Sequence, residues 1–173
     1  MDEQRIKKAQ NNVKGYIDDG KLHKITHMDK LIYNTYLKNA RESLRVADML
    51  CKEKSSSLWV VVTSYYSMFY MACAYLYNIG YKTKGEIVHQ VINDTLIVQA
   101  RHKIKNHILK NYDEEKEKAL TIVDNYLDNY EREKAKRASF QYETTEEIKE
   151  SKAKTSLERA KEFLTLMEEI MHE

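Results

Sequence analysis

Apolar residues recur at intervals of three and four along most of the chain, which is the spacing of one face of an amphipathic helix. The pattern predicts main helices over residues 29–51, 58–78, 84–98, 113–136 and 144–171, and a short helical segment over residues 3–14. Residues 99–112 are more polar and basic, and their pattern leaves helix and loop open. We therefore expect an all-α fold, an up-and-down bundle of four to five main helices over residues 29–173 with an N-terminal arm over residues 1–28.

The segment 58–78 differs from the others because it is apolar on nearly every side and carries no charged residue. A helix of this kind must be covered by its neighbours, so we expect it at the centre of the bundle. Its small and hydroxyl-bearing residues favour a buried helix over a membrane span. The serines at 55–57 offer side-chain acceptors for its first amides, and Gly80 is placed to end it.

Composition agrees with long helices in one domain, because 173 residues contain no proline and only four glycines. The net charge is only +2, so any surface that attracts nucleic acid must be local. Residues 1–10 are charged and lack the apolar stretch of a secretory signal, which predicts a cytoplasmic protein with no membrane span. Cys51 and Cys73 fall inside helical patterns, where buried thiols are expected.

Two histidine patterns raise the question of a metal. Glu86 with His89, and Glu169 with His172, have the Glu-x-x-His spacing of di-iron bundles. Such a site also needs carboxylates from two other helices, and the central helix offers none, so we interpret the spacing as chance. The pair of histidines at 23 and 27 has no clear third ligand. No metal and no cofactor are expected, and there is no glycine-rich phosphate loop.

The segment 132–142 joins several cations to an aromatic pair at the junction of two helices. Its basic residues are Arg132, Lys134, Lys136 and Arg137, and its aromatic residues are Phe140 and Tyr142. One interpretation is structural: the cations complement the dipole at a helix C-terminus and the aromatic rings pack the loop. The other is a binding surface for phosphate.

Several of these segments together resemble the HEPN domain. The stretch 59–72, Trp-Val-Val-Val-Thr-Ser-Tyr-Tyr-Ser-Met-Phe-Tyr-Met-Ala, is followed by Gly80 and then His89, as in the first half of HEPN domains. Residues 20–22, the helix around 40–50, the Arg137-x4-Tyr142 motif and residues 160–163 continue the match over nearly the whole chain. The chain is most similar to the HEPN subgroup, once catalogued as an uncharacterised family, in which Arg-x4-Tyr occupies the place of the active-site motif.

The resemblance implies a site at Arg137 and Tyr142. In the family an arginine is followed after four to six residues by a histidine, and two copies meet at a homodimer interface to cut RNA without metal. The arginine can stabilise charge on the phosphate, and the histidine can move a proton near neutral pH. Here Tyr142 stands in the place of the histidine, and a tyrosine with a pKa of about 10 is a poor general base. His89 is a candidate substitute proton carrier.

Two functions follow from this comparison. The first is a homodimer that binds RNA or nucleotide through Arg132, Lys134, Lys136 and His89, possesses at most weakened metal-independent endoribonuclease activity, and pairs with a minimal nucleotidyltransferase in a toxin-antitoxin system. The second is a non-catalytic interaction or scaffold module that docks a nucleotidyltransferase. Thirteen tyrosines favour the second, because amphipathic aromatic side chains suit protein interfaces as well as nucleic-acid bases.

Overall fold

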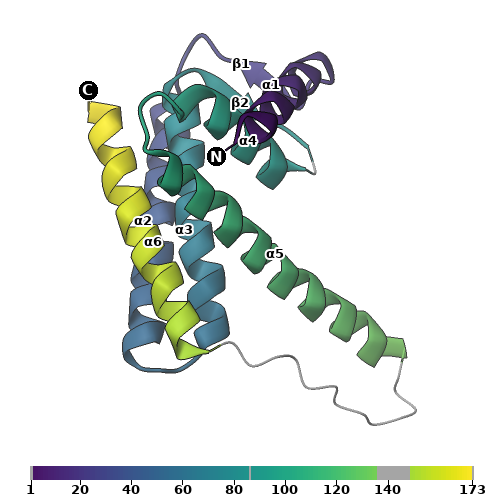
Figure 1. Cartoon of the computed structure of the whole chain (residues 1–173), viewed down its shortest axis with the longest axis vertical. Helices are drawn as coiled ribbons and strands as arrows, with labels where there is room; N and C mark the ends of the chain where they lie inside the picture. The colour runs from purple at the N-terminus through teal and green to yellow at the C-terminus, as the bar shows by residue number, and fades with distance from the viewer. Residues whose placement is uncertain (1, 86, 136–148, 173) are drawn as a thin grey trace.

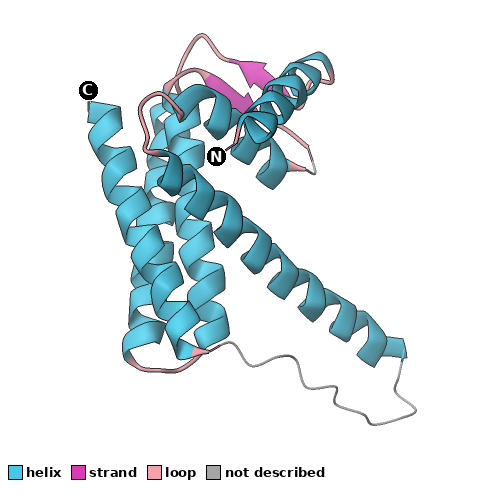
Figure 2. Cartoon of the chain, in the orientation of Figure 1, coloured by secondary structure: helices cyan, strands magenta, loops and turns pink. Residues whose placement is uncertain are grey.

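The computed structural model describes residues 2–85, 87–135 and 149–172, and for residues 126–135 it describes only the backbone. These residues form a helical bundle with a very small antiparallel sheet, as Figure 2 shows. The elements in chain order are α1 (Glu3–Asp18), β1 (Leu22–Lys24), α2 (Lys30–Lys52), α3 (Ser57–Asn78), β2 (Tyr81–Thr83), α4 (Val88–Ala100), α5 (Asn106–Ala135) and α6 (Glu150–His172). The predicted all-α fold is confirmed.

Helices α2, α3 and α6 lie side by side and form the body of the bundle (Figure 1). Helices α1 and α4 and the two strands lie together at one end of this body. Helix α5 starts against α3 and α6 at that end and then runs away from them, so that its C-terminal part stands apart from the bundle (Figure 1).

Helix α3 is the centre of the bundle, as its composition predicts. Fifteen of its 22 residues are buried, whereas an amphipathic helix buries only the residues of one face. The Oγ atom of Ser56 accepts a hydrogen bond from the Trp59 amide at 3.3 Å and caps the start. Gly80 follows the last turn with a φ of +88°, a conformation that side-chain-bearing residues rarely adopt.

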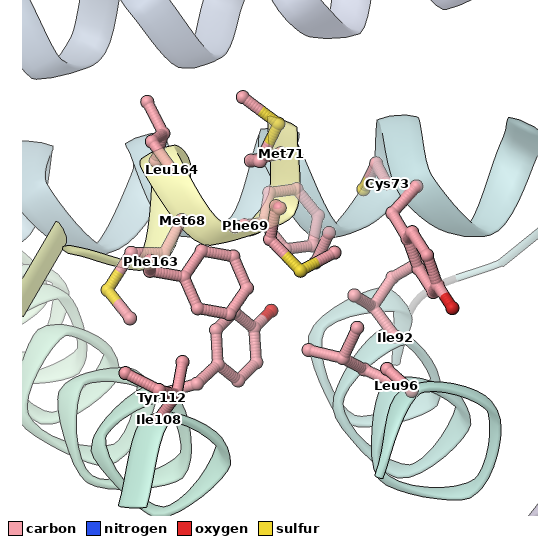
Figure 3. Close-up of a cluster of buried hydrophobic side chains, with 14 of the residues drawn as sticks. Met68, Phe69, Met71, Cys73, Ile92, Leu96, Ile108, Tyr112, Phe163 and Leu164 are labelled. Carbon is pink, nitrogen blue, oxygen red and sulfur yellow. The ribbon is translucent and has the colours of Figure 1, made fainter. Parts of the chain in front are cut away.

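The largest hydrophobic cluster joins α3 to α4, α5 and α6 (Figure 3). The rings of Tyr112 on α5 and Phe163 on α6 are stacked, with centroids 5.2 Å apart. Met68 and Met71 on α3 are completely buried beside them. The predicted inner stripe of α6 is confirmed at its buried positions Leu157, Ala160, Phe163, Leu164 and Met167.

Several element bounds differ from the sequence prediction, among them the start of α4, which is Val88 rather than residue 84 because β2 and a turn occupy the residues before it. Helix α5 begins at Asn106 rather than near residue 113, because Ile108, Leu109 and Tyr112 are buried against the bundle and extend the helix backwards. The strands β1 and β2 were not predicted, because each has three residues and only Leu22 among them is buried. Strands this short carry no alternating pattern that a sequence could show.

Helix α1 is longer than predicted and packs on α4. Asp2 caps it by accepting a hydrogen bond from the Arg5 amide at 2.7 Å, and Ala9 and Val13 are its buried residues. Val13, Leu22 and Val91 form a small separate cluster that ties α1, β1 and α4 together. Within the described part of the chain, no helix is long and apolar enough to cross a membrane. Both cysteines are free thiols.

Candidate functional site

The sequence-predicted site residues fall into two separate regions. His89 lies in the first turn of α4, against α3 and within reach of the charge of Lys116 on α5. Arg132 and Lys134 belong to the last turns of α5, where only the backbone is described. Lys136, Arg137 and Tyr142 lie outside the described residues.

His89 is held in a cluster of aromatic side chains from α3. Its Nδ1 atom lies 2.7 Å from the Tyr65 hydroxyl, and its ring centroid lies 4.3 Å from that of Phe69. The Tyr66 ring meets His89 edge-on at 5.7 Å. The imidazole therefore packs against Phe69 and Tyr66 and is held at Nδ1 by a hydrogen bond with Tyr65. His89 as a whole is half-buried.

Burial and the positive charge of Lys116 both lower the pKa of His89 below its ordinary value of 6.5. The imidazole is therefore neutral at pH 7. Burial also raises the pKa of Tyr65, so its hydroxyl keeps its proton. The Tyr65 hydroxyl and Nδ1 share this hydrogen bond, whose donor is set by the imidazole tautomer, and the contact fixes the orientation of the ring.

A network of buried polar groups lies beside His89, centred on the completely buried carboxylate of Asp94 in α4. Three donors from α1 reach it: Arg5 Nη1 at 2.7 Å, Asn12 Nδ2 at 2.8 Å and the Tyr16 hydroxyl at 2.9 Å. Gln90 Nε2 donates from α4 at 3.0 Å. A buried carboxylate with four donors is fully hydrogen-bonded, so the network holds α1 on the bundle.

These hydrogen bonds decide the charge state of Asp94. Burial by itself would raise the pKa of this carboxyl, but the donors from Asn12, Arg5, Gln90 and Tyr16 together hold the pKa below its ordinary value. Burial and the Asp94 carboxylate raise the pKa of Tyr16 to about 12. Asp94 is therefore ionised and Tyr16 protonated at neutral pH.

The network continues from α4 into α5 and reaches the surroundings of His89. Arg5 Nε lies 3.3 Å from Asp113 Oδ2, and Asn93 donates a second hydrogen bond to the same carboxylate. Lys116 Nζ lies 3.4 Å from Asp113 and donates to Gln90 Oε1 at 3.0 Å. Because the Lys116 side chain is only 3% exposed, its charge acts on His89 with little solvent screening.

The structure does not bring His89 together with Arg132 and Lys134 within one chain. Lys116, the α5 residue that acts on His89, precedes Arg132 by about 24 Å along the helix axis, at about 1.5 Å per residue. The other histidines belong to elements or turns at the same end of the bundle as His89: β1 and the turn after it, the turn before α5, the first turn of α5 and the end of α6 (Figure 1).

No metal site is visible in the part of the chain that the structure describes. No group of three histidine, cysteine or acidic side chains there is arranged to hold an ion. Glu86 of the first Glu-x-x-His pair lies outside the described residues, and its partner His89 is bound by Tyr65 through Nδ1.

The Asp94 network was not predicted from the sequence. A signal was present, because Asp94 is the only charged residue between Val91 and Leu96, and the structure buries this whole stretch. A carboxylate in such a place needs donors, and only the fold shows that α1 supplies them.

Comparison with known proteins adds no relative. No protein-family model matches the chain, and no curated protein matches it.

Proposed function

We propose that this chain is a HEPN-like protein that binds RNA or nucleotide at the C-terminal end of α5 and acts as a homodimer. The observation that carries the proposal is the course of α5, which leaves the bundle and takes Arg132 and Lys134 away from it (Figure 1). The Arg137-x4-Tyr142 motif follows directly in the sequence. Cations at a helix C-terminus that stands apart from the bundle can approach a phosphate backbone without steric conflict.

We propose binding as the main activity and cleavage as weakened or lost. Metal-independent cleavage needs a group that accepts the proton of the ribose hydroxyl near pH 7, and Tyr142 is a poor one. His89 is a weak candidate for this role, because its Nδ1 is bound by Tyr65 and its α5 neighbour Lys116 precedes Arg132 by about 24 Å along the helix, at about 1.5 Å per residue. Any remaining cleavage therefore depends on Tyr142 or on a second copy of the chain.

The homodimer is supported by an aromatic strip on α3. Trp59, Tyr66 and Tyr70 follow one another at helical spacing on a helix that is otherwise almost entirely buried. Trp59 is 48% exposed and the two tyrosines are half-buried. Aromatic side chains in such positions are enriched at protein interfaces. A dimer contact here brings together two copies of the central helix.

We further propose that the protein resides in the cytoplasm and pairs with a minimal nucleotidyltransferase, as the HEPN resemblance implies for a toxin-antitoxin system. The exposed aromatic strip also favours the second candidate function, a scaffold that docks such a partner without chemistry. The two functions differ at Arg137, since a pure scaffold does not need this residue for RNA binding.

The test is incubation of a mixed-sequence RNA with the purified protein in a chelator, with binding and cutting recorded in the same samples. We expect the wild-type protein to bind RNA with little or no cutting, and Arg137→Ala to bind more weakly. Lys38→Ala, an exposed cation on α2, is the matched control and should bind like wild type. Equal binding by wild type and Arg137→Ala would refute the proposed site and favour the scaffold.

The dimer is tested by the mass of the protein in solution. We expect Trp59→Glu to shift the protein from dimer to monomer, because a charge is introduced into the aromatic strip. Met49→Glu is the control, because Met49 is equally exposed but lies on α2. A monomeric wild-type protein, or a dimer unaffected by Trp59→Glu, would contradict this interface.

A further inference from the structure

A cavity of about 460 Å³ lies between α3, α5 and α6, at the place where α5 leaves the bundle. Its volume is within the range of small-molecule sites. The lining residues are Val61 of α3, Glu117, Lys118, Thr121 and Ile122 of α5, and Lys152 and Ser156 of α6. None of them belongs to the sequence-predicted RNA site, and one of them, Glu117, is linked to the surroundings of His89 through its ion pair with Lys116.

The wall of this cavity combines apolar and polar groups. Val61 and Ile122 provide an apolar surface from two different helices. Lys118 and Lys152 bring two ammonium groups from α5 and α6, and the Glu117 carboxylate provides an acceptor. The two lysines can bind an anionic group of a ligand, while Glu117 can accept hydrogen bonds from another part of the same ligand.

The polar side of the cavity is fixed by Glu115, a completely buried carboxylate behind it. Ser156 Oγ donates to Glu115 Oε2 at 2.6 Å, and Lys118 Nζ lies 2.8 Å from Glu115 Oε1. Arg159 Nη1 lies 2.8 Å from the same oxygen. The buried charge is hydrogen-bonded on both oxygens, which positions Ser156 and Lys118 before any ligand arrives.

Among the residues that line the cavity, two lysines, Lys118 and Lys152, stand against one carboxylate, Glu117. Glu115 is shared by two cations, Lys118 and Arg159. Glu117 is already paired with Lys116 at 2.9 Å. Lys152 lines the cavity from an exposed position on α6 and has no ion-pair partner among the described residues. An anionic group of a ligand can therefore bind the ammonium group of Lys152, and the ammonium group of Lys118 is held nearby by Glu115.

We propose that this cavity binds a small organic phosphate that also carries hydroxyl or amino groups and an apolar body, the class to which nucleoside monophosphates belong. The phosphate lies against Lys118 and Lys152, the apolar body covers Val61 and Ile122, and donors of the ligand reach Glu117.

This site is separate from the proposed RNA site. Lys118 precedes Arg132 by about 21 Å along α5, at about 1.5 Å per residue. The proposal rests on the residues of the cavity and does not depend on the RNA-binding function, so each of the two can fail alone.

The test is calorimetric titration of the full chain with AMP, with adenosine and inorganic phosphate as comparison ligands. We expect AMP to bind more tightly than either, because only AMP fills both halves of the cavity. Lys152→Glu should weaken AMP binding at least about tenfold, since it removes one charge-assisted contact and adds a charge that repels the phosphate. Lys154→Glu is the matched control, because Lys154 is exposed on the same helix and does not line the cavity.

A second variant, Thr121→Trp, fills the cavity from an exposed position and should also abolish AMP binding without loss of helix content in circular dichroism. Arg137→Ala should leave AMP binding at the cavity unchanged, because Arg137 is not among the lining residues. AMP binding that is lost in Arg137→Ala but kept in Lys152→Glu and Thr121→Trp would overturn the cavity proposal and support the RNA site alone. Absence of AMP binding with RNA binding intact would also overturn it, whereas AMP binding without RNA binding would uphold the cavity and refute the proposed function.

Discussion

Replacement of Asp94 by alanine removes the acceptor at the centre of the α1–α4 network. The Asp94 carboxylate is completely buried and accepts hydrogen bonds from Arg5, Asn12, Tyr16 and Gln90. In Asp94→Ala these donors lose their common partner. The Arg5 guanidinium, whose side chain is only 19% exposed, keeps one ion pair, the 3.3 Å contact with Asp113.

Removal of one partner from a buried ion pair costs about 3 to 5 kcal/mol, because the remaining charge stays desolvated. Three of the four donors belong to α1, so the protein can relieve part of this cost by releasing α1 from the bundle. The measured loss is therefore limited by the free energy that holds α1 in place. We expect a loss of about 3 kcal/mol, which is a large part of a typical stability of about 5 to 15 kcal/mol.

The assay is urea unfolding of Asp94→Ala, combined with hydrogen exchange of the backbone amides. We expect faster exchange in α1 than in wild type and a smaller change in the central helix α3. Glu168→Ala is the control, because it breaks the exposed ion pair of Glu168 with Arg41 and should cost less than about 1 kcal/mol. A loss below about 1 kcal/mol in Asp94→Ala, with unchanged exchange in α1, would refute the role given to this network.

Three further predictions concern buried polar groups. Ser64→Ala should leave stability unchanged or raise it by about 1 kcal/mol, because the Ser64 hydroxyl is buried without a partner among the described residues. Ser67→Ala should lower stability by about 1 kcal/mol in the same unfolding assay, because Ser67 donates to a backbone carbonyl at 2.8 Å; equal effects of the two variants would contradict this assignment. The His89 imidazole should titrate below pH 6.5 in NMR spectra, and Lys116→Met should raise the pKa of His89. Because the pKa is lowered in the folded state, the stability that depends on neutral His89 is fully present above about pH 6.5 and is lost as the pH falls. A pKa of His89 at or above 6.5 would be inconsistent with its environment. The lowered pKa of Asp94 likewise contributes stability that is complete above about pH 4 and lost at lower pH, so Asp94→Asn should flatten the acid limb of the stability curve, and an unchanged limb would exclude this contribution.

The sequence was sufficient for the helices whose packing follows a simple pattern. Helix α3 has no charged residue and α6 has one apolar stripe, so both were predicted from composition and spacing. The start of α5 was missed because the polar residues of 99–112 concealed the apolar spacing of Ile104, Ile108 and Tyr112. These side chains are buried by the tertiary packing on α3 and α6, which local propensity does not describe.

The candidate site was predictable only in part. Arg137 and Tyr142 are predicted from the order of residues, and because they lie outside the described part of the chain they stay a prediction. The place of His89 could not be found in this way, because its contacts with Tyr65 and Phe69 join residues about twenty positions apart through helix packing. The Asp94 network depends in the same way on α1, whose polar face is unremarkable in the sequence.

The most direct test of the proposed function is the salt dependence of RNA binding, measured by fluorescence anisotropy with a labelled single-stranded RNA at several salt concentrations. If Arg137 contacts a phosphate, Arg137→Ala weakens binding and reduces the slope of log K against log salt by about 0.7, whereas Lys38→Ala changes neither. Binding that is insensitive to salt, or a slope that is the same in wild type and Arg137→Ala, would contradict phosphate recognition at the end of α5.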